Sequence, residues 1–181
     1  MIHWPETPPV LHLGDLTLRP WQAADAPDVL AACQDPEIQR WTTVPNPYRP
    51  EHAEGFVGGV TAAGWLRRTS ANVAVVGGDG RLLAANGLVR VDLVNRTAEI
   101  GYWVAPWARR RGVATRSTVA IAAWAFELGF ARVELRAAAP NVGSRAVAIA
   151  AGFREEGVLR SAVERAGVRD DLVVHGLLAT D

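Results

Sequence analysis

The chain has 181 residues, 19 basic and 19 acidic side chains, and a hydrophobic content of 49%. These values suit a single globular domain over residues 1–181 with a substantial core. The sequence argues against a membrane-spanning protein, because no apolar run is long enough to cross a bilayer, and against a disulfide-stabilised protein, because it has one cysteine. It also argues against a nucleic-acid-binding protein, because the basic residues are too dispersed to form a continuous basic face.

The first half of the chain predicts a short hairpin, several helices and an antiparallel pair of strands. Alternating leucines around Gly14-Asp15 indicate a first strand or hairpin over 10–19. The cluster Gly77-Gly78-Asp79-Gly80 is typical of a turn between two strands. The other predicted elements here are helices over 24–34 and 51–68, a short turn over 37–41, a proline-rich loop over 42–50, and strands over 70–76 and 82–91.

The second half alternates strands and helices. The predicted elements are a strand over 97–104, a helix over 113–128, a strand over 132–138, a helix over 142–151, and strands over 154–161 and 170–178 joined through a turn at 164–167. Helices inserted in a run of mainly hairpin-connected strands predict an α+β fold. We expect a mixed, mainly antiparallel sheet flanked by helices.

The segment between the strand 97–104 and the next helix has the features of an anion site. The first N–H groups of a helix have no partner within it, and the helix dipole makes that end positive. Gly112 allows a ligand to approach the backbone, small Ala114 leaves room, and three arginines add phosphate donors. The spacing matches neither a Walker P-loop nor Gly-x-Gly-x-x-Gly, so we expect a different phosphate ligand.

Three stretches resemble the GNAT acetyltransferases, and in particular their RimJ/RimL-type branch. The pattern Arg109-x-x-Gly112-x-Ala114, which follows Val104-Ala-Pro, resembles the family's acetyl-CoA pyrophosphate loop. Glu99-Ile-Gly-Tyr-Trp-Val104 resembles the preceding strand, and Asn141-x-x-Ser144 with Ala151-Gly152-Phe153 resembles the second cofactor motif. The resemblance covers about residues 10–178 and implies a GNAT-like fold with acetyl-CoA as co-substrate.

The resemblance also implies which residues contact the cofactor. Backbone groups of Trp103 and Val104 would meet the pantetheine amides, and Asn141 would meet the pantetheine or the adenine side while capping its helix. Arg145 would reach the phosphates, although a solvated surface arginine explains it equally well. The predicted phosphate-loop residues are Arg109, Arg110, Arg111, Gly112, Val113, Ala114 and Thr115.

Two residues are candidates for the chemistry of amine acetylation. Ser144 matches the serine that lies near the coenzyme sulfur in this branch, where it would donate a hydrogen bond; its alternative role is a helix cap. Glu99 is the candidate base, and its alternative role is an ion pair with Arg90 or Arg136. Glu134 and Asp171 are weaker candidates for the same role.

Aromatic residues are candidates for the acceptor wall. In this branch the first helices shape the acceptor side of the cleft, and core packing is the alternative for each residue. The segment 41–68 carries two acidic residues, Glu51 and Glu54, which argues against a polycationic substrate. The predicted wall residues are Trp41, Tyr48, Phe56, Trp65 and Tyr102.

The sequence therefore predicts an N-acetyltransferase that transfers an acetyl group from acetyl-CoA to a primary amine, first of all a protein or peptide α-amino group. The alternatives are acetylation of a small-molecule amine, and a CoA-binding regulatory module without catalysis. The four histidines have no metal-binding spacing, so we expect no metal. The N-terminus lacks the pattern of a signal peptide, so we expect a cytoplasmic protein, a monomer or homodimer, without nucleic-acid or membrane partners.

Overall fold

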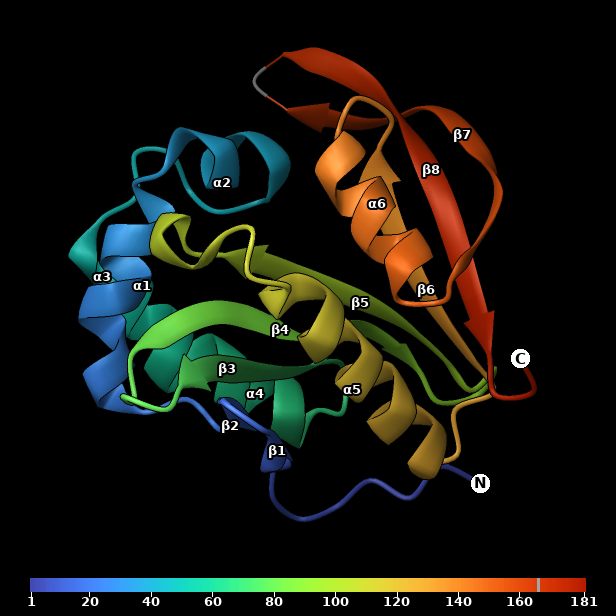
Figure 1. Ribbon diagram of the computed structural model, residues 1–181, viewed down its shortest axis with the longest axis horizontal. Helices are drawn as coiled ribbons and strands as arrows, with labels where there is room; N and C mark the ends of the chain where they lie inside the picture. The colour runs from blue at the N-terminus through green and yellow to red at the C-terminus, as the bar shows by residue number, and fades with distance from the viewer. Residues whose placement is uncertain (166) are drawn as a thin grey trace.

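The computed structural model describes residues 1–165 and 167–181 and contains an eight-stranded sheet in the order β1-β2-β3-β4-β5-β6-β8-β7. All neighbouring strands pair antiparallel except β5 and β6, which are parallel. Helices α1 to α3 lie against one face of the sheet, and α5 and α6 lie against the other (Figure 1). The predicted α+β fold with a mixed, mainly antiparallel sheet is confirmed.

The strands are β1 (Leu11–Leu13), β2 (Leu16–Arg19), β3 (Ala71–Gly77), β4 (Leu82–Asp92), β5 (Thr97–Val104), β6 (Arg132–Ala138), β7 (Arg154–Arg165) and β8 (Val168–Leu178). The α-helices are α1 (Ala26–Cys33), α2 (Pro36–Trp41), α3 (Pro50–Gly55), α4 (Thr61–Leu66), α5 (Val113–Glu127) and α6 (Val142–Ala150). Short 3₁₀ turns cover Ala23–Asp25 and Pro106–Ala108, and a π-helical turn covers Phe56–Val60.

Alternation along the central strands divides the buried side chains into two cores. In β3, Val73 and Val75 pack with α5, whereas Ala74 and Val76 pack with α1 and α3. This is the expected result for a strand buried on both faces, because successive side chains point to opposite sides. The sheet thus separates an α5/α6 side from an α1–α3 side.

Most of the predicted elements are present, and two differ in form. The predicted helix 51–68 is broken into α3, a π turn over Phe56–Val60 and α4. Strand β7 runs to Arg165 instead of ending at Ser161, because a bulge between Leu159 and Val163 lets pairing resume. Of the predicted turn at 164–167, Ala166 lies outside the described residues.

The parallel strands β5 and β6 pair only over their first halves. Their register runs from Thr97↔Arg132 to Ile100↔Leu135, after which both strands continue without further pairing to each other in the described chain. Figure 1 shows the two strands side by side at one end and separating toward the other. The β4–β5 register shifts between Leu88 and Arg90, and such a bulge bends a strand. The sheet therefore opens into a V beyond Ile100.

Two further properties concern only residues 1–165 and 167–181. No helix there combines the length and apolar character needed to cross a membrane. Nor do three or more histidine, cysteine or acidic side chains gather there as a metal site.

Candidate active site

The N-terminus of α5 packs on the same side of the sheet as Tyr102 of β5. Gly112, which precedes the helix, has a φ of 71° and is exposed, and no side chain of the described residues caps this helix end. The left-handed conformation is accessible to glycine without strain, so the backbone can turn sharply into the helix. The leading N–H groups of α5 are thus available to an anion, as the phosphate-loop prediction requires.

The three arginines of this loop have different surroundings. The Arg109 guanidinium donates to Asp35 at 2.5 Å (Nη2–Oδ1) and 3.3 Å (Nη1–Oδ2), so it is held on α2. Arg110 and Arg111 are exposed, and neither forms an ion pair within the described chain. Arg110 and Arg111 are therefore the arginine side chains of the loop that remain available to a phosphate. The sequence analysis predicts all three arginines as phosphate ligands.

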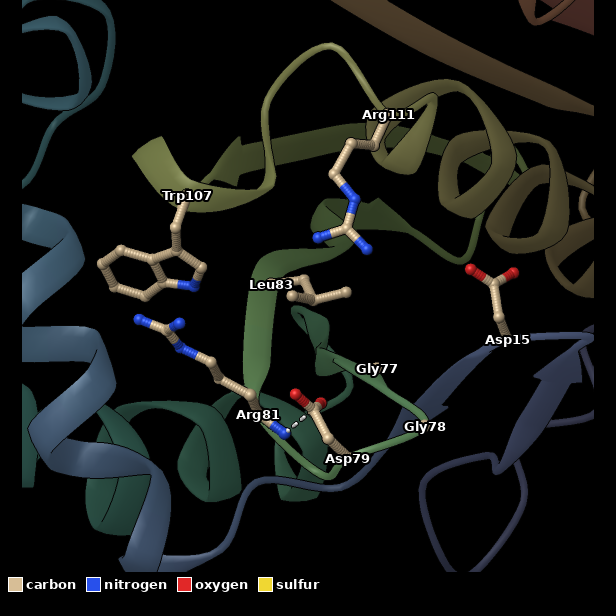
Figure 2. Close-up of a pocket in the computed structure, with 8 residues that line it drawn as sticks. All are labelled: Asp15, Gly77, Gly78, Asp79, Arg81, Leu83, Trp107 and Arg111. Atoms are coloured by element: carbon tan, nitrogen blue, oxygen red, sulfur yellow. Dashed lines mark hydrogen bonds between the residues drawn. The ribbon is translucent and has the colours of Figure 1, made fainter.

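A pocket of about 210 Å³ lies beside the loop, on the β3–β4 side of α5. Figure 2 shows the Arg111 side chain extending into it and the Arg81 guanidinium lying against the indole of Trp107. The Arg81 Cζ is 4.6 Å from the Trp107 ring centre, and the Trp107 Nε1 donates to the Leu82 carbonyl at 2.9 Å. The cation–π contact holds a second positive charge at the rim.

A buried hydrogen-bond network fixes α5 on the sheet. The Asn86 Nδ2 of β4 donates to the Ser117 Oγ at 2.8 Å and to the Thr118 Oγ1 at 3.2 Å, and all three residues are fully buried. Its Oδ1 accepts from the Gly87 N–H at 2.7 Å. Sequence reasoning missed this network, although an asparagine amid apolar strand residues was a signal for it. The network positions the helix whose N-terminus forms the anion site.

Ser144 lies across the V from β5 and contacts Tyr102. The hydroxyls of Ser144 and Tyr102 are 3.0 Å apart, and either can donate. Asn141 caps α6, because its Oδ1 accepts from the Ser144 N–H at 3.0 Å. The Ser144 hydroxyl therefore performs no cap. Burial raises the pKa of Tyr102 to about 12, so the phenol keeps its proton at neutral pH.

Glu99 lies on the opposite face of β5, near the point where the V closes. It shares the face of Trp103, which packs toward α1 and α3, whereas Tyr102 packs toward α5. Its Oε2 is 3.5 Å from both the Arg90 Nε and the Arg136 Nε and has no hydrogen-bond partner among the described residues. Both predicted ion pairs are present together.

The protonation of Glu99 is set mainly by burial. Burial raises the pKa of Glu99 and outweighs the lowering by Arg90 and Arg136, while Glu134 raises the pKa further. A carboxylate whose pKa is raised binds a proton more readily than an ordinary one. Ser144 and Glu99 thus lie on opposite faces of β5, Ser144 beside Tyr102 where the strands have separated and Glu99 within the stretch paired with β6.

The aromatic residues predicted as an acceptor wall divide between core and surface positions. Trp65 belongs to the α5-side core and stacks on Trp124 at 6.4 Å, and Tyr48 is buried against α1. Trp41 and Phe56 are half-buried at the surface of the α1–α3 side. Core packing therefore accounts for Trp65 and Tyr48.

Arg145 forms its polar contacts with Ala139 and with Glu155 of β7. Its Nη2 lies 3.3 Å from the Glu155 Oε2, and its Nη1 donates to the Ala139 carbonyl at 3.4 Å. Together with buried His175 it lines a second pocket, of about 160 Å³, between α6 and strands β7 and β8. The ion pair with Glu155 accounts for its position.

Comparison with known proteins identifies the family. The model of the family described as "Acetyltransferase (GNAT) domain" matches residues 15–154, which are most of the chain. This chain belongs to the GNAT acetyltransferase family. The relatives support the RimJ/RimL-type branch, as the three sequence motifs suggested.

Three relatives of this GNAT chain carry most information. "Putative ribosomal N-acetyltransferase YdaF" of Bacillus subtilis is 42% identical over 101 residues, which span 55% of this chain and 55% of that protein. Mycobacterium smegmatis RimJ, solved with CoA-disulfide, is 25% identical with a TM-score of 0.84 and covers 98% and 89% of the two chains. RimL, solved with coenzyme A, shares the fold at 19% identity with a TM-score of 0.86 and covers 94% and 98%.

Proposed function

We propose that this protein transfers the acetyl group of acetyl-CoA to the α-amino group of a protein or peptide, and that residues 1–181 act as one catalytic unit. The observation that carries the proposal is the open V between β5 and β6, with the Ser144–Tyr102 pair across it and the uncapped N-terminus of α5 on the Tyr102 side of the sheet. A cytoplasmic location and a monomeric or homodimeric state belong to the proposal.

The residues present fit the coenzyme at both ends. The N–H groups of Val113, Ala114 and Thr115 are suited to hold a pyrophosphate, with Arg110 and Arg111 adding charge. The edges of Trp103 and Val104 that face β6 have no strand partner there in the described chain, which suits the pantetheine amides. When bound, acetyl-CoA supplies the activated acetyl thioester.

Side chains of the protein then accept a proton from the amine and donate hydrogen bonds to the leaving group. Glu99 accepts a proton from the incoming ammonium, directly or through water, so that the amine becomes nucleophilic. The second proton, which the nitrogen loses as the C–N bond forms and the C–S bond breaks, goes to the departing thiolate or to water. The Ser144 hydroxyl, polarised by Tyr102, donates a hydrogen bond to the departing sulfur. Because the pKa of Tyr102 is about 12 and that of a thiol about 8.5, Tyr102 donates a hydrogen bond without giving up its proton.

The choice of a protein or peptide as acceptor rests on the related proteins and on the aromatic residues predicted to line the acceptor side. YdaF bears the name "Putative ribosomal N-acetyltransferase" and RimL the name "Ribosomal L7/L12 alpha-N-protein acetyltransferase", and these names support a protein N-terminus as the acceptor. Trp41 and Phe56, which are half-buried, stay the candidates to contact the first side chains of a peptide. A small-molecule amine stays the second candidate, and a non-catalytic CoA-binding module the third.

An amine panel tests the proposal. Acetyl-CoA is mixed with peptides that carry a free α-amine, with the same peptides blocked at the N-terminus but containing lysine, and with small amines, and released thiol is measured. We expect turnover only with free N-termini, with mass spectrometry placing the acetyl group on the first residue. Turnover of small amines alone would support the second candidate, and CoA binding without turnover the third.

A further inference from the structure

One carboxylate joins the phosphate loop to the acceptor side of the molecule. Asp35 accepts hydrogen bonds from the N–H groups of Glu37 and Ile38, both at 3.0 Å, and also binds Arg109 through both of its own oxygens. Asp35 and Arg109 are 74 residues apart in the chain. Only 15% of the Asp35 side chain is exposed, so these contacts are largely shielded from water.

On the acceptor side, Asp35 determines where α2 begins. This helix has six residues, and so short a helix depends on its cap. It ends at Trp41, and the following loop returns to Tyr48, whose carbonyl accepts from the Gln34 Nε2 at 2.9 Å. A shift of Asp35 would therefore move the whole segment 35–48.

On the cofactor side, Asp35 fixes the start of the phosphate loop. Arg109 is extended, and the next turns of the chain have positive φ at Arg110 (62°) and Gly112 (71°). Holding Arg109 at one end and α5 at the other leaves this short loop few conformations. Preorganising a loop in its bound shape reduces the entropy lost on binding.

We propose that Asp35 is a positioning residue that couples the two substrate sites, so that coenzyme bound at the phosphate loop orders the acceptor segment 35–48. Arg109 transmits this coupling through its ion pair and makes no phosphate contact with its side chain. The proposal rests on the proposed function, because it requires CoA to bind at this loop.

Three variants and a matched control test it. Asp35→Asn keeps an amide oxygen that can cap α2 but removes the charge that binds Arg109. Arg109→Gln removes the other partner, and the double variant removes both. The control is Asp25→Asn, which breaks a similar two-bond pair with Arg19 (2.7 and 2.8 Å) that includes no residue of the phosphate loop. Thermal unfolding first establishes that each variant is folded.

The readouts are CoA affinity by calorimetry and amide hydrogen exchange of the segment 35–48 with and without CoA. We expect CoA to slow exchange in this segment of the natural protein and of Asp25→Asn. Asp35→Asn and Arg109→Gln should each bind CoA about tenfold more weakly and lose this protection. The double variant should be no more than about twofold weaker than either single one, because the two changes remove one interaction.

Other results would overturn the coupling. Unchanged CoA affinity and protection in Asp35→Asn would reduce the pair to a structural contact. Multiplicative losses in the double variant would mean that Arg109 binds phosphate by itself. Failure of the natural protein to bind CoA would instead reject the proposed function, and the coupling with it.

Discussion

Replacing Ser144 by alanine tests the chemistry most directly. The change removes one hydroxyl, whose only hydrogen-bond partner within the described chain is the Tyr102 phenol at 3.0 Å. The cap of α6 stays intact, because Asn141 provides it through its own side chain. The substitution therefore separates a role in turnover from a role in holding the helix.

The expected magnitudes follow from this geometry. Loss of a donor that acts on developing charge typically costs about 10²- to 10³-fold in rate. A thiolate is a good leaving group, so we expect about 10²-fold in kcat, equivalent to about 2.7 kcal/mol, with little change in the KM for acetyl-CoA. Stability should fall by only about 0.5–1.5 kcal/mol, the net value of one hydrogen bond.

Tyr102→Phe provides the matched control. It leaves the Ser144 donor in place and removes only its polarisation, so we expect a loss of about three- to tenfold in kcat. The double variant should be about as slow as Ser144→Ala alone, because Tyr102 acts through Ser144. Since the pKa of Tyr102 is about 12, its removal should leave the pH profile unchanged between about pH 6 and 10.

Steady-state rates and thermal unfolding measured on the same samples decide the matter. Full kcat in Ser144→Ala would refute the assignment of this hydroxyl to the sulfur. A double variant whose losses multiply would show that Tyr102 meets the substrates independently.

Three further predictions concern the loop, the base and the buried network. Gly112→Val should weaken CoA binding more than about tenfold by calorimetry, because a β-branched residue disfavours the φ of 71°; unchanged binding by a folded variant would reject the loop. Glu99→Gln should lower kcat/KM and alter its acid limb while CoA affinity is retained. Because burial raises the pKa of Glu99, the protonated carboxyl stabilises the folded protein at low pH, and this stabilisation is lost as the pH rises through the folded-state pKa. Chemical denaturation should therefore show that Glu99→Gln becomes more stable relative to the natural protein as the pH rises above about 4.5. Asn86→Ala should lower the free energy of unfolding by about 2–3 kcal/mol, and a loss below about 0.5 kcal/mol would contradict the role of its bonds to α5.

Local sequence signals specify the helices and strands around the site. Strands β5 and β6 have the predicted bounds, and α5 begins at Val113 as predicted, because apolar periodicity, Pro106 and Gly112 are local signals. The long β7 was underestimated, since its side chains are almost all exposed and carry no apolar alternation. The π turn within the predicted helix 51–68 was also missed.

Which side chains contact one another depends on the folded chain as a whole. The sequence analysis predicts Tyr102 as a residue of the acceptor wall, whereas its hydroxyl contacts that of Ser144, which lies 42 residues further along the chain. Arg109 was grouped with the phosphate ligands, yet its guanidinium is bound by Asp35. Trp65 fitted a wall as well as a core by composition, and it stacks on Trp124 inside. Local patterns specify backbone form within a few residues, whereas such contacts depend on sheet register and on helix placement, which are settled by packing across the whole chain.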